Sequence, residues 1–313
     1  MSAWGTDIFS DDLAASIRTE YNALLAIGKD GEEAEQIIMR GFVDYVNQNP
    51  EEEPVFWFAL ALAESRKGRL SESVKNQAMY YLNNGGDLER WNEPGDQKKY
   101  LKRVQVIEKL RATLTGPQPE KKKIRKATVH HCPWPVGSLL AYRIVNADEL
   151  QGRAIFGKYA LLRLVDIQRW PVSKLLPDER YSEKMIVSLY GWCGAEIPDP
   201  NITNNLQFIP FNNPQPMPQP TETVDAILAL GAKLLPKEAI TNIREHVFNT
   251  NVEMCADLDW RPFRHYKPDI TCLGQDPNTA EETAGFKTDI CSVGMYGLPA
   301  LDLTLECRLE KYL

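Results

Sequence analysis

The first third of the chain places apolar residues three and four positions apart, which is the period of an amphipathic helix. After Asp11, for example, Ile17, Tyr21 and Leu24 fall on one helical face. The pattern predicts five helices, over residues 11–27, 30–48, 52–67, 71–83 and 94–114. Residues 55–63 are apolar on every side, so we expect the third helix to lie at the centre of a bundle.

Polar residues and glycines mark where these helices begin and end. Ser10, Asp11 and Asp12 can cap the first helix, and Gly28 can end it. Asp30 and Glu33 have the spacing of a capping box. The third and fourth helices resemble one tetratricopeptide-like hairpin, but no second copy follows at a period of ~34 residues. An irregular bundle is therefore the prediction.

From Val129 onward the pattern changes to short apolar and β-branched runs bounded by glycine and polar residues. These runs predict strands over 138–145, 158–167, 184–191 and 206–211. Residues 301–309 alternate strictly between apolar and polar, which predicts a further strand with one buried face. Such a strand is typical of an antiparallel sheet.

Two segments rich in proline or charge suggest boundaries. Residues 117–128 follow a helix breaker and include Lys121–Lys126, with five basic residues in six. The proline-rich loop 212–220 gives a possible sub-boundary, and 221–234 has the stripe of an inserted helix. The predicted fold is α+β: a helical bundle over 1–116, a basic linker over 117–128, and a mostly antiparallel β domain with a helical insertion over 129–313.

Charge and composition narrow the classes of function. The chain of 313 residues carries a net charge of −7, with −5 before residue 119, +4 over 119–128 and −6 after it. Such a balance does not favour a protein that coats nucleic acid or anionic membrane. The basic run could contact nucleic acid, but a solvated connector is the simpler interpretation. The six widely spaced cysteines, the lack of a leader and the lack of a long apolar run predict a cytoplasmic protein.

No pattern in the sequence specifies a reaction. His130, His131 and Cys132 form the one His/Cys cluster, but neighbouring residues in a strand point to opposite faces. The other two histidines are remote from it, so we predict no metal site. Phosphate-cradling loops, dinucleotide fingerprints and nucleophile elbows are missing, and we predict no cofactor and no catalytic residue.

Candidate binding residues fall in three places. Near the N-terminus they are Trp4, Asp7, Asp11 and Asp12, for which capping and packing form the competing explanation. The second place is the aromatic, proline-rich loop at Trp134. The third is the tract 260–266, with Trp260, Arg261, Arg264 and Tyr266. Arginines and aromatics are common at interface hot spots, although aromatics of a β core give the same pattern.

Four stretches resemble a bacterial family of unknown function. They are the opening Trp4-Gly5-Thr6…Phe9…Asp11-Asp12, then Phe56-Trp57…Gly68-Arg69-Leu70, Asp87–Trp91, and Cys132–Gly137 with Ala141–Arg143 and Gly157–Tyr159. The last stretch is also similar to a β-barrel module of immunity proteins in polymorphic toxin systems. It departs from that module at Ser138 and Leu140, where the pattern prefers Asp and Phe. Residues 200–313 carry no such resemblance.

Two hypotheses of function follow. The first is a non-enzymatic protein that binds another protein; the resemblance implies an immunity-type inhibitor, and a basic toxin domain would complement the acidic chain. The alternative is an enzyme or small-ligand binder with a site between the domains near residues 4–12. The oligomeric state is left open.

Overall fold

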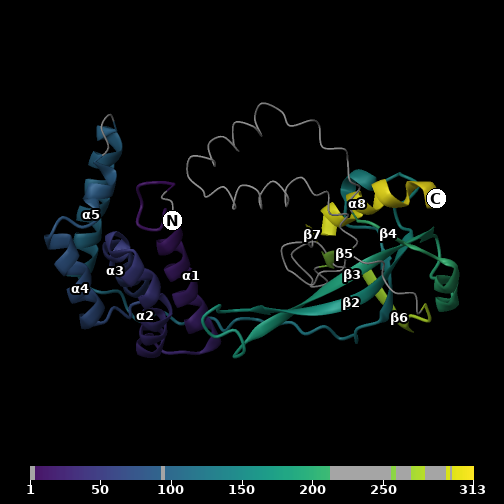
Figure 1. The fold of residues 1–313 in the computed structure, drawn as a ribbon, viewed down its shortest axis with the longest axis horizontal. Coiled ribbons are helices and arrows are strands. Elements are labelled where there is room, and N and C mark those ends of the chain that lie inside the picture. The colour runs from purple at the N-terminus through teal and green to yellow at the C-terminus, as the bar shows by residue number, and fades with distance from the viewer. Residues whose placement is uncertain (1–3, 93–95, 212–254, 259–268, 279–293, 297) are drawn as a thin grey trace. The chain divides into compact units, whose positions relative to one another are not determined.

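A computed structural model describes residues 4–92, 96–211, 255–258, 269–278, 294–296 and 298–313. The chain divides into two compact units. The helical unit comprises residues 1–129 and the segment 170–182, and the sheet unit comprises 130–169 and 183–313. The predicted α+β class is confirmed, with helices first and a mostly antiparallel sheet after them (Figure 1).

The described residues of the helical unit form five α-helices, close to the predicted ranges. They are α1 (Asp12–Ile27), α2 (Gly31–Gln48), α3 (Glu53–Arg66), α4 (Glu72–Asn83) and α5 (Gln97–Thr115). Short 3-10 turns η1 (Pro50–Glu52) and η2 (Leu88–Trp91) lie between them. The predicted capping box forms between Asp30 and Glu33, and Gly28 ends α1 in the left-handed conformation.

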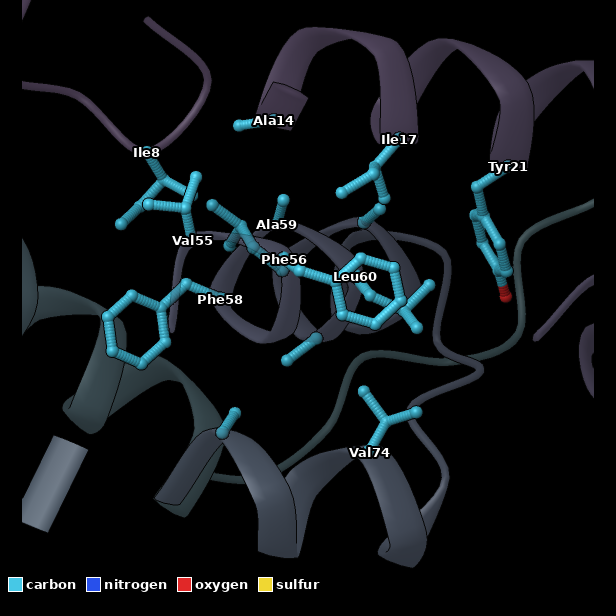
Figure 2. Packing of buried hydrophobic residues seen from close by; sticks show 14 of the residues in the cluster. Ile8, Ala14, Ile17, Tyr21, Val55, Phe56, Phe58, Ala59, Leu60 and Val74 are labelled. Atoms are coloured by element: carbon cyan, nitrogen blue, oxygen red, sulfur yellow. The ribbon is translucent and has the colours of Figure 1, made fainter. Parts of the chain in front are cut away.

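Helix α3 is the centre of this unit. It contacts α1, α2, α4 and α5, and nearly all of its residues are buried. Figure 2 shows Ile8, Ala14 and Ile17 on one side of its apolar residues and Val74 of α4 on another. A helix that is apolar all round must be enclosed on every side, which the bundle achieves.

The basic residues predicted as a linker lie within the helical unit and run against its helices as a strap (residues 117–128). The backbone N–H of Lys122 donates to the Lys67 carbonyl at 3.0 Å, and that of Ala127 donates to the Ala26 carbonyl at 2.9 Å. The side chain of Ile124 packs against the helical core. Gly68, with φ +66°, leaves room for this passage, since a Cβ there would lie 2.5 Å from the Pro119 carbonyl oxygen.

Seven strands are described in the sheet unit. They are β1 (Ser138–Arg143), β2 (Tyr159–Pro171), β3 (Tyr181–Gly194), β4 (Phe208–Ile209), β5 (Cys255–Leu258), β6 (Asp269–Gln275) and β7 (Gly294–Tyr296). Their order is β6-β1-β2-β3-β5-β7, with β4 also paired to β3. The pairs β1–β2, β1–β6, β3–β4 and β3–β5 are antiparallel, and the pair β5–β7 is parallel. The described part of this unit also has short 3-10 turns, η3 (Asp148–Leu150), η4 (Pro200–Asn205) and η6 (Glu310–Tyr312).

Two expectations about the sheet unit are wrong. The barrel implied by the immunity-module resemblance does not form, because the described strands end in an open sheet with β6 and β7 at its edges. The strand predicted over 301–309 is a helix, α8 (Leu298–Leu309). The proline-rich loop 212–220 and the predicted inserted helix 221–234 lie outside the described residues.

The error at 301–309 has a simple geometric cause. Apolar residues at every second position also fall at every fourth position, and residues four apart lie on one face of a helix. In α8 that face is formed by Leu301, Leu305 and Leu309, which are buried against the sheet. The intervening Leu303 and Cys307 are exposed, as a helix requires and a half-buried strand does not allow. Leucine, glutamate and arginine also favour helix over strand.

Asp302 fixes α8 to the sheet. Its carboxylate is fully buried and accepts hydrogen bonds from the Tyr142 hydroxyl and from the backbone N–H groups of Asn146 and Ala147. Burial raises the pKa of Asp302 above its ordinary value, while these hydrogen bonds act in the opposite direction. The carboxylate thus joins helix α8, strand β1 and the turn that follows β1.

None of the helices in the described part of the chain is long and apolar enough to cross a bilayer.

A first prediction tests the strap. Gly68→Ala should lower the free energy of unfolding of the helical unit by about 3 kcal/mol, because the new Cβ meets both a strained φ and the strap backbone. Gly85→Ala is the matched control, since Gly85 has φ +91° but nothing within 4 Å of the added atom. It should cost only about 1 kcal/mol. Equal losses in urea unfolding would show that the strap does not restrict this position.

A second prediction tests the attachment of α8. Asp302→Ala should destabilise the sheet unit by about 3 kcal/mol, since it leaves buried N–H and O–H groups without an acceptor. Glu306→Ala on the same helix removes an ion pair with Arg153, whose side chain is 63% exposed, and should cost less than about 1 kcal/mol. Thermal and urea unfolding measure both. A loss for Asp302→Ala no larger than for Glu306→Ala contradicts the assignment.

Candidate functional site

The N-terminal residues form a fixed turn ahead of α1. The Trp4 N–H donates to the Ser10 carbonyl at 3.0 Å, and the Ser10 N–H donates to the Asp7 carbonyl at 3.0 Å. The Trp4 side chain is 61% exposed, and that of Asp7 is exposed as well. Ile8 and Phe9 are buried and join the core of the bundle. The turn is therefore anchored by Ile8 and Phe9 and leaves Trp4 and Asp7 exposed.

Asp11 and Asp12 lie at the start of α1 rather than in a pocket. The Asp11 carboxylate accepts from the Leu13 N–H at 2.9 Å, which is the geometry of an N-cap. Its second oxygen lies 3.1 Å from Nη2 of Arg90. Asp12 is the acidic residue of the first turn. Both positions fit the capping explanation weighed for them.

A buried ion pair secures the same turn. The guanidinium of Arg103 donates to both carboxylate oxygens of Asp87, at 3.1 and 2.6 Å, and to the Thr6 carbonyl at 2.8 Å. Trp91 lies against the same guanidinium, with its ring centroid 5.4 Å from Cζ. Two of the stretches that carry the family resemblance, 4–12 and 87–91, thus meet around Arg103.

A cavity of about 450 Å³ opens beside this turn, between α1, α3 and α5. We call it the basic pocket. Buried apolar side chains line its interior, and exposed charged side chains line its edge. The apolar set is Ile8, Phe9, Leu62 and Leu110, and the charged set is Asp7, Arg18, Arg66 and Lys109. Ligand pockets commonly enclose about 300 to 1,000 Å³, so the volume suits a small group or one side chain.

Two guanidiniums of the basic pocket are held by one aromatic ring. Cζ of Arg18 lies 4.7 Å from the centroid of the Phe9 ring, and Cζ of Arg66 lies 5.0 Å from it. Among the described residues, neither of these arginines nor Lys109 forms an ion pair. Three cations against the single carboxylate of Asp7 make the edge positive. The arrangement can bind an anion next to an apolar group.

A second cavity lies in the sheet unit and has a different character. It encloses about 530 Å³ beside α8 and the loop at Arg153. Arg153 and Glu306 line it and pair with each other at 3.0 Å, and a second carboxylate, Glu310, also lines it. Its one cation is therefore already neutralised, whereas those of the basic pocket are not.

The other predicted binding residues are not brought to the basic pocket. Trp134 belongs to the sheet unit and is half-buried against its core, as the packing explanation expects. Trp260, Arg261, Arg264 and Tyr266 lie outside the described residues. Within the part of the chain that is described, no group of three or more metal-ligating side chains is arranged to hold an ion.

Asp7 is a candidate from the sequence, but the arginines and the lysine that surround it are not. Arg18, Arg66 and Lys109 come from three different helices and look like ordinary solvated positions in the sequence. The one available signal was that Arg18 and Lys109 each lie next to a core residue, Ile17 and Leu110, while Arg66 follows the buried Ser65. That signal is shared by many helix-surface cations, so it does not single out a site.

The helical core also holds buried polar atoms without a hydrogen-bond partner. They include the Tyr21 hydroxyl, Glu64 Oε1 and Arg69 Nε. Burial raises the pKa of Glu64 to about 8, with Glu35 adding to the rise and the Ser71 N–H opposing it. The Tyr21 hydroxyl points away from the apolar cluster (Figure 2), and burial raises its pKa as well, with Glu64 a further cause. Glu64 is therefore protonated in the folded chain at neutral pH.

A third prediction follows from Glu64. The unfolded chain ionises this carboxyl near 4.5, so the stability of the folded form relative to Glu64→Gln is highest below that pH. This relative stability should fall by a few kcal/mol as pH rises from about 4.5 to about 8, and should then level off. Urea unfolding of both proteins across this range measures the difference. Glu72→Gln, on the exposed start of α4, is the control, and its difference in stability from the wild type should not change in this way with pH. Parallel curves of stability against pH for the wild type and Glu64→Gln would contradict the assignment.

Comparisons with known proteins add no relative. No family model, curated protein or solved structure matches this chain.

Proposed function

We propose that this protein is a non-enzymatic binding protein, and that its helical unit recognises another protein through an acidic segment seated in the basic pocket. One observation carries the proposal: three cations without an ion pair in the described chain surround a cavity with an apolar interior. An unneutralised cluster of this kind is best satisfied by a carboxylate from outside.

The chemistry of the edge suits a carboxylate beside an apolar side chain. Arginine presents paired N–H donors that match the two oxygens of a carboxylate. The contacts of Arg18 and Arg66 with Phe9 restrict both guanidiniums before a ligand arrives, which lowers the entropy lost on binding. The buried Leu62 and Leu110 offer an apolar surface for the neighbouring side chain of the partner.

The partner is another protein, as the sequence predicts, and the contact is made by an acidic segment of that protein. The resemblance implies a toxin domain as the partner, and the net charge of −7 favours a basic one. The basic pocket instead favours an acidic stretch of the partner, whatever the charge of the partner as a whole. An immunity-type role stays a prediction that rests on the resemblance alone.

A small anionic ligand is the second candidate. The volume of about 450 Å³ favours it, because a cavity of that size can enclose a metabolite with one or two acidic groups. In that case the ligand alone should raise the melting temperature of the purified chain. A protein segment should instead depend on contacts beyond the pocket.

A fourth prediction separates these possibilities. The double variant Arg18→Ala, Arg66→Ala should recover at least about tenfold less of a stoichiometric protein partner from an extract of the native host, since arginines of this kind act as hot spots. The matched control is Lys98→Ala, Lys102→Ala, which removes two exposed cations of α5 outside the pocket. Quantitative mass spectrometry of the eluates compares the three proteins.

The outcomes are distinct. A partner lost from the pocket variant and kept by the control supports the proposal. A partner kept by both variants overturns it. A chain that recovers no partner, but whose melting temperature rises with a panel of di- and tricarboxylates only when Arg18 and Arg66 are present, supports the second candidate and overturns the first.

A further inference from the structure

The strap presents a row of cations that nothing described in the chain neutralises. Lys121, Lys122, Lys123, Arg125 and Lys126 are all exposed. Within the described ranges, none of the five forms an ion pair. Like charges at adjacent positions repel one another, so this row disfavours its own ordering.

The helical unit nevertheless holds the row in one place. Both backbone groups of Lys122 are bonded, its N–H to the Lys67 carbonyl and its carbonyl to Nη1 of Arg69 at 3.0 Å. Ile124 is anchored among core residues, and Gly68 lets the backbone of 119–120 approach closely. The strap is therefore a fixed cationic surface rather than a free connector.

The strap follows the last turn of α5, which lines the basic pocket. Lys109 and Thr113 of the pocket belong to the last two turns of α5, which leads into the strap after Thr115. Arg66 of the pocket precedes Lys67, whose carbonyl accepts the Lys122 N–H. The backbone of the strap thus passes the end of α3, where Arg66 of the pocket is the sequence neighbour of Lys67.

From this continuity we infer that the acidic segment of the partner is a polypeptide that places one apolar side chain and its neighbouring carboxylate in the basic pocket and then runs along the strap with several further carboxylates. The inference rests on the proposed function and names the chemistry of its ligand. Residues 119–126 span about 26 Å if extended, which matches about eight residues of an extended peptide.

The pocket favours a polypeptide over a nucleic acid. A nucleic acid gains affinity by stacking bases on open aromatic faces. The aromatic ring of the pocket, Phe9, is 9% exposed and already contacts two guanidiniums. Its remaining interior is aliphatic, which suits a leucine-sized side chain.

A fifth prediction tests the inference with synthetic peptides and the full chain. The long probe has one leucine followed by a run of about seven glutamates, and the short probe has the same leucine followed by one glutamate. Lys121→Gln, Lys123→Gln should weaken binding of the long probe by roughly tenfold, and should leave the short probe unchanged. Fluorescence anisotropy at low and moderate salt measures both, and the loss should be larger at low salt.

The controls keep the two proposals separate. Lys98→Gln, Lys102→Gln removes the same charge from α5 away from the strap and should change neither probe. Arg18→Ala, Arg66→Ala should weaken both probes. If the pocket variant weakens both probes and the strap variant weakens neither, the inference fails while the proposed function stands.

Two further outcomes would overturn the inference. Failure of both probes to bind the wild type overturns the inference and leaves the proposed function to the pull-down experiment. Tighter binding of a single-stranded oligonucleotide than of the long probe, lost on substitution in the strap, overturns the inference in favour of a nucleic acid. All variants change exposed residues, and an unchanged melting temperature confirms that each one is folded.

Discussion

The buried ion pair of Arg103 and Asp87 is the interaction on which the candidate site depends. Its guanidinium also donates to the Thr6 carbonyl and thereby fixes the turn that carries Asp7, Phe9 and Ser10 into the wall of the pocket. Removing one partner of such a pair leaves a charge buried without compensation, which costs about 3 to 5 kcal/mol. The position of Phe9, and with it that of two arginines, follows from a contact made elsewhere.

The sheet unit is organised by the same physical device. Asp302 joins α8 to β1, and Asp276 accepts from the hydroxyls of Tyr190 and Thr203 and from the Asn278 N–H. In each case one buried carboxylate satisfies donors from segments far apart in the sequence. Burial is tolerated because every oxygen finds donors, and loss of the carboxylate would leave those donors unpaired.

How much could be predicted from sequence depended on the range of the interactions. Helix ends such as the Asp30–Glu33 box and Gly28 were predicted because capping acts over three or four residues. The strand predicted over 301–309 was wrong because its apolar pattern fits both the period of a strand and that of a helix. Only the tertiary burial of Leu301, Leu305 and Leu309 decides between the two. Asp7 was identified, but Arg18, Arg66 and Lys109 meet it only through the packing of three helices. No local rule could bring them together.

Net charge and local charge point to different partners in this chain, and the local field should prevail at short range. The total of −7 suggested a basic partner, yet three described cations at the pocket and five at the strap form no ion pair within the described residues. Exposed charges more than about 8 to 10 Å apart are largely screened at physiological salt. A ligand at the pocket therefore responds mainly to Arg18, Arg66, Lys109 and the strap, while the acidic remainder influences only the approach. The field of the whole acidic chain then orients a partner as it approaches, and the field of the pocket and the strap selects the face that binds. A basic protein with an acidic stretch on its surface is complementary to both.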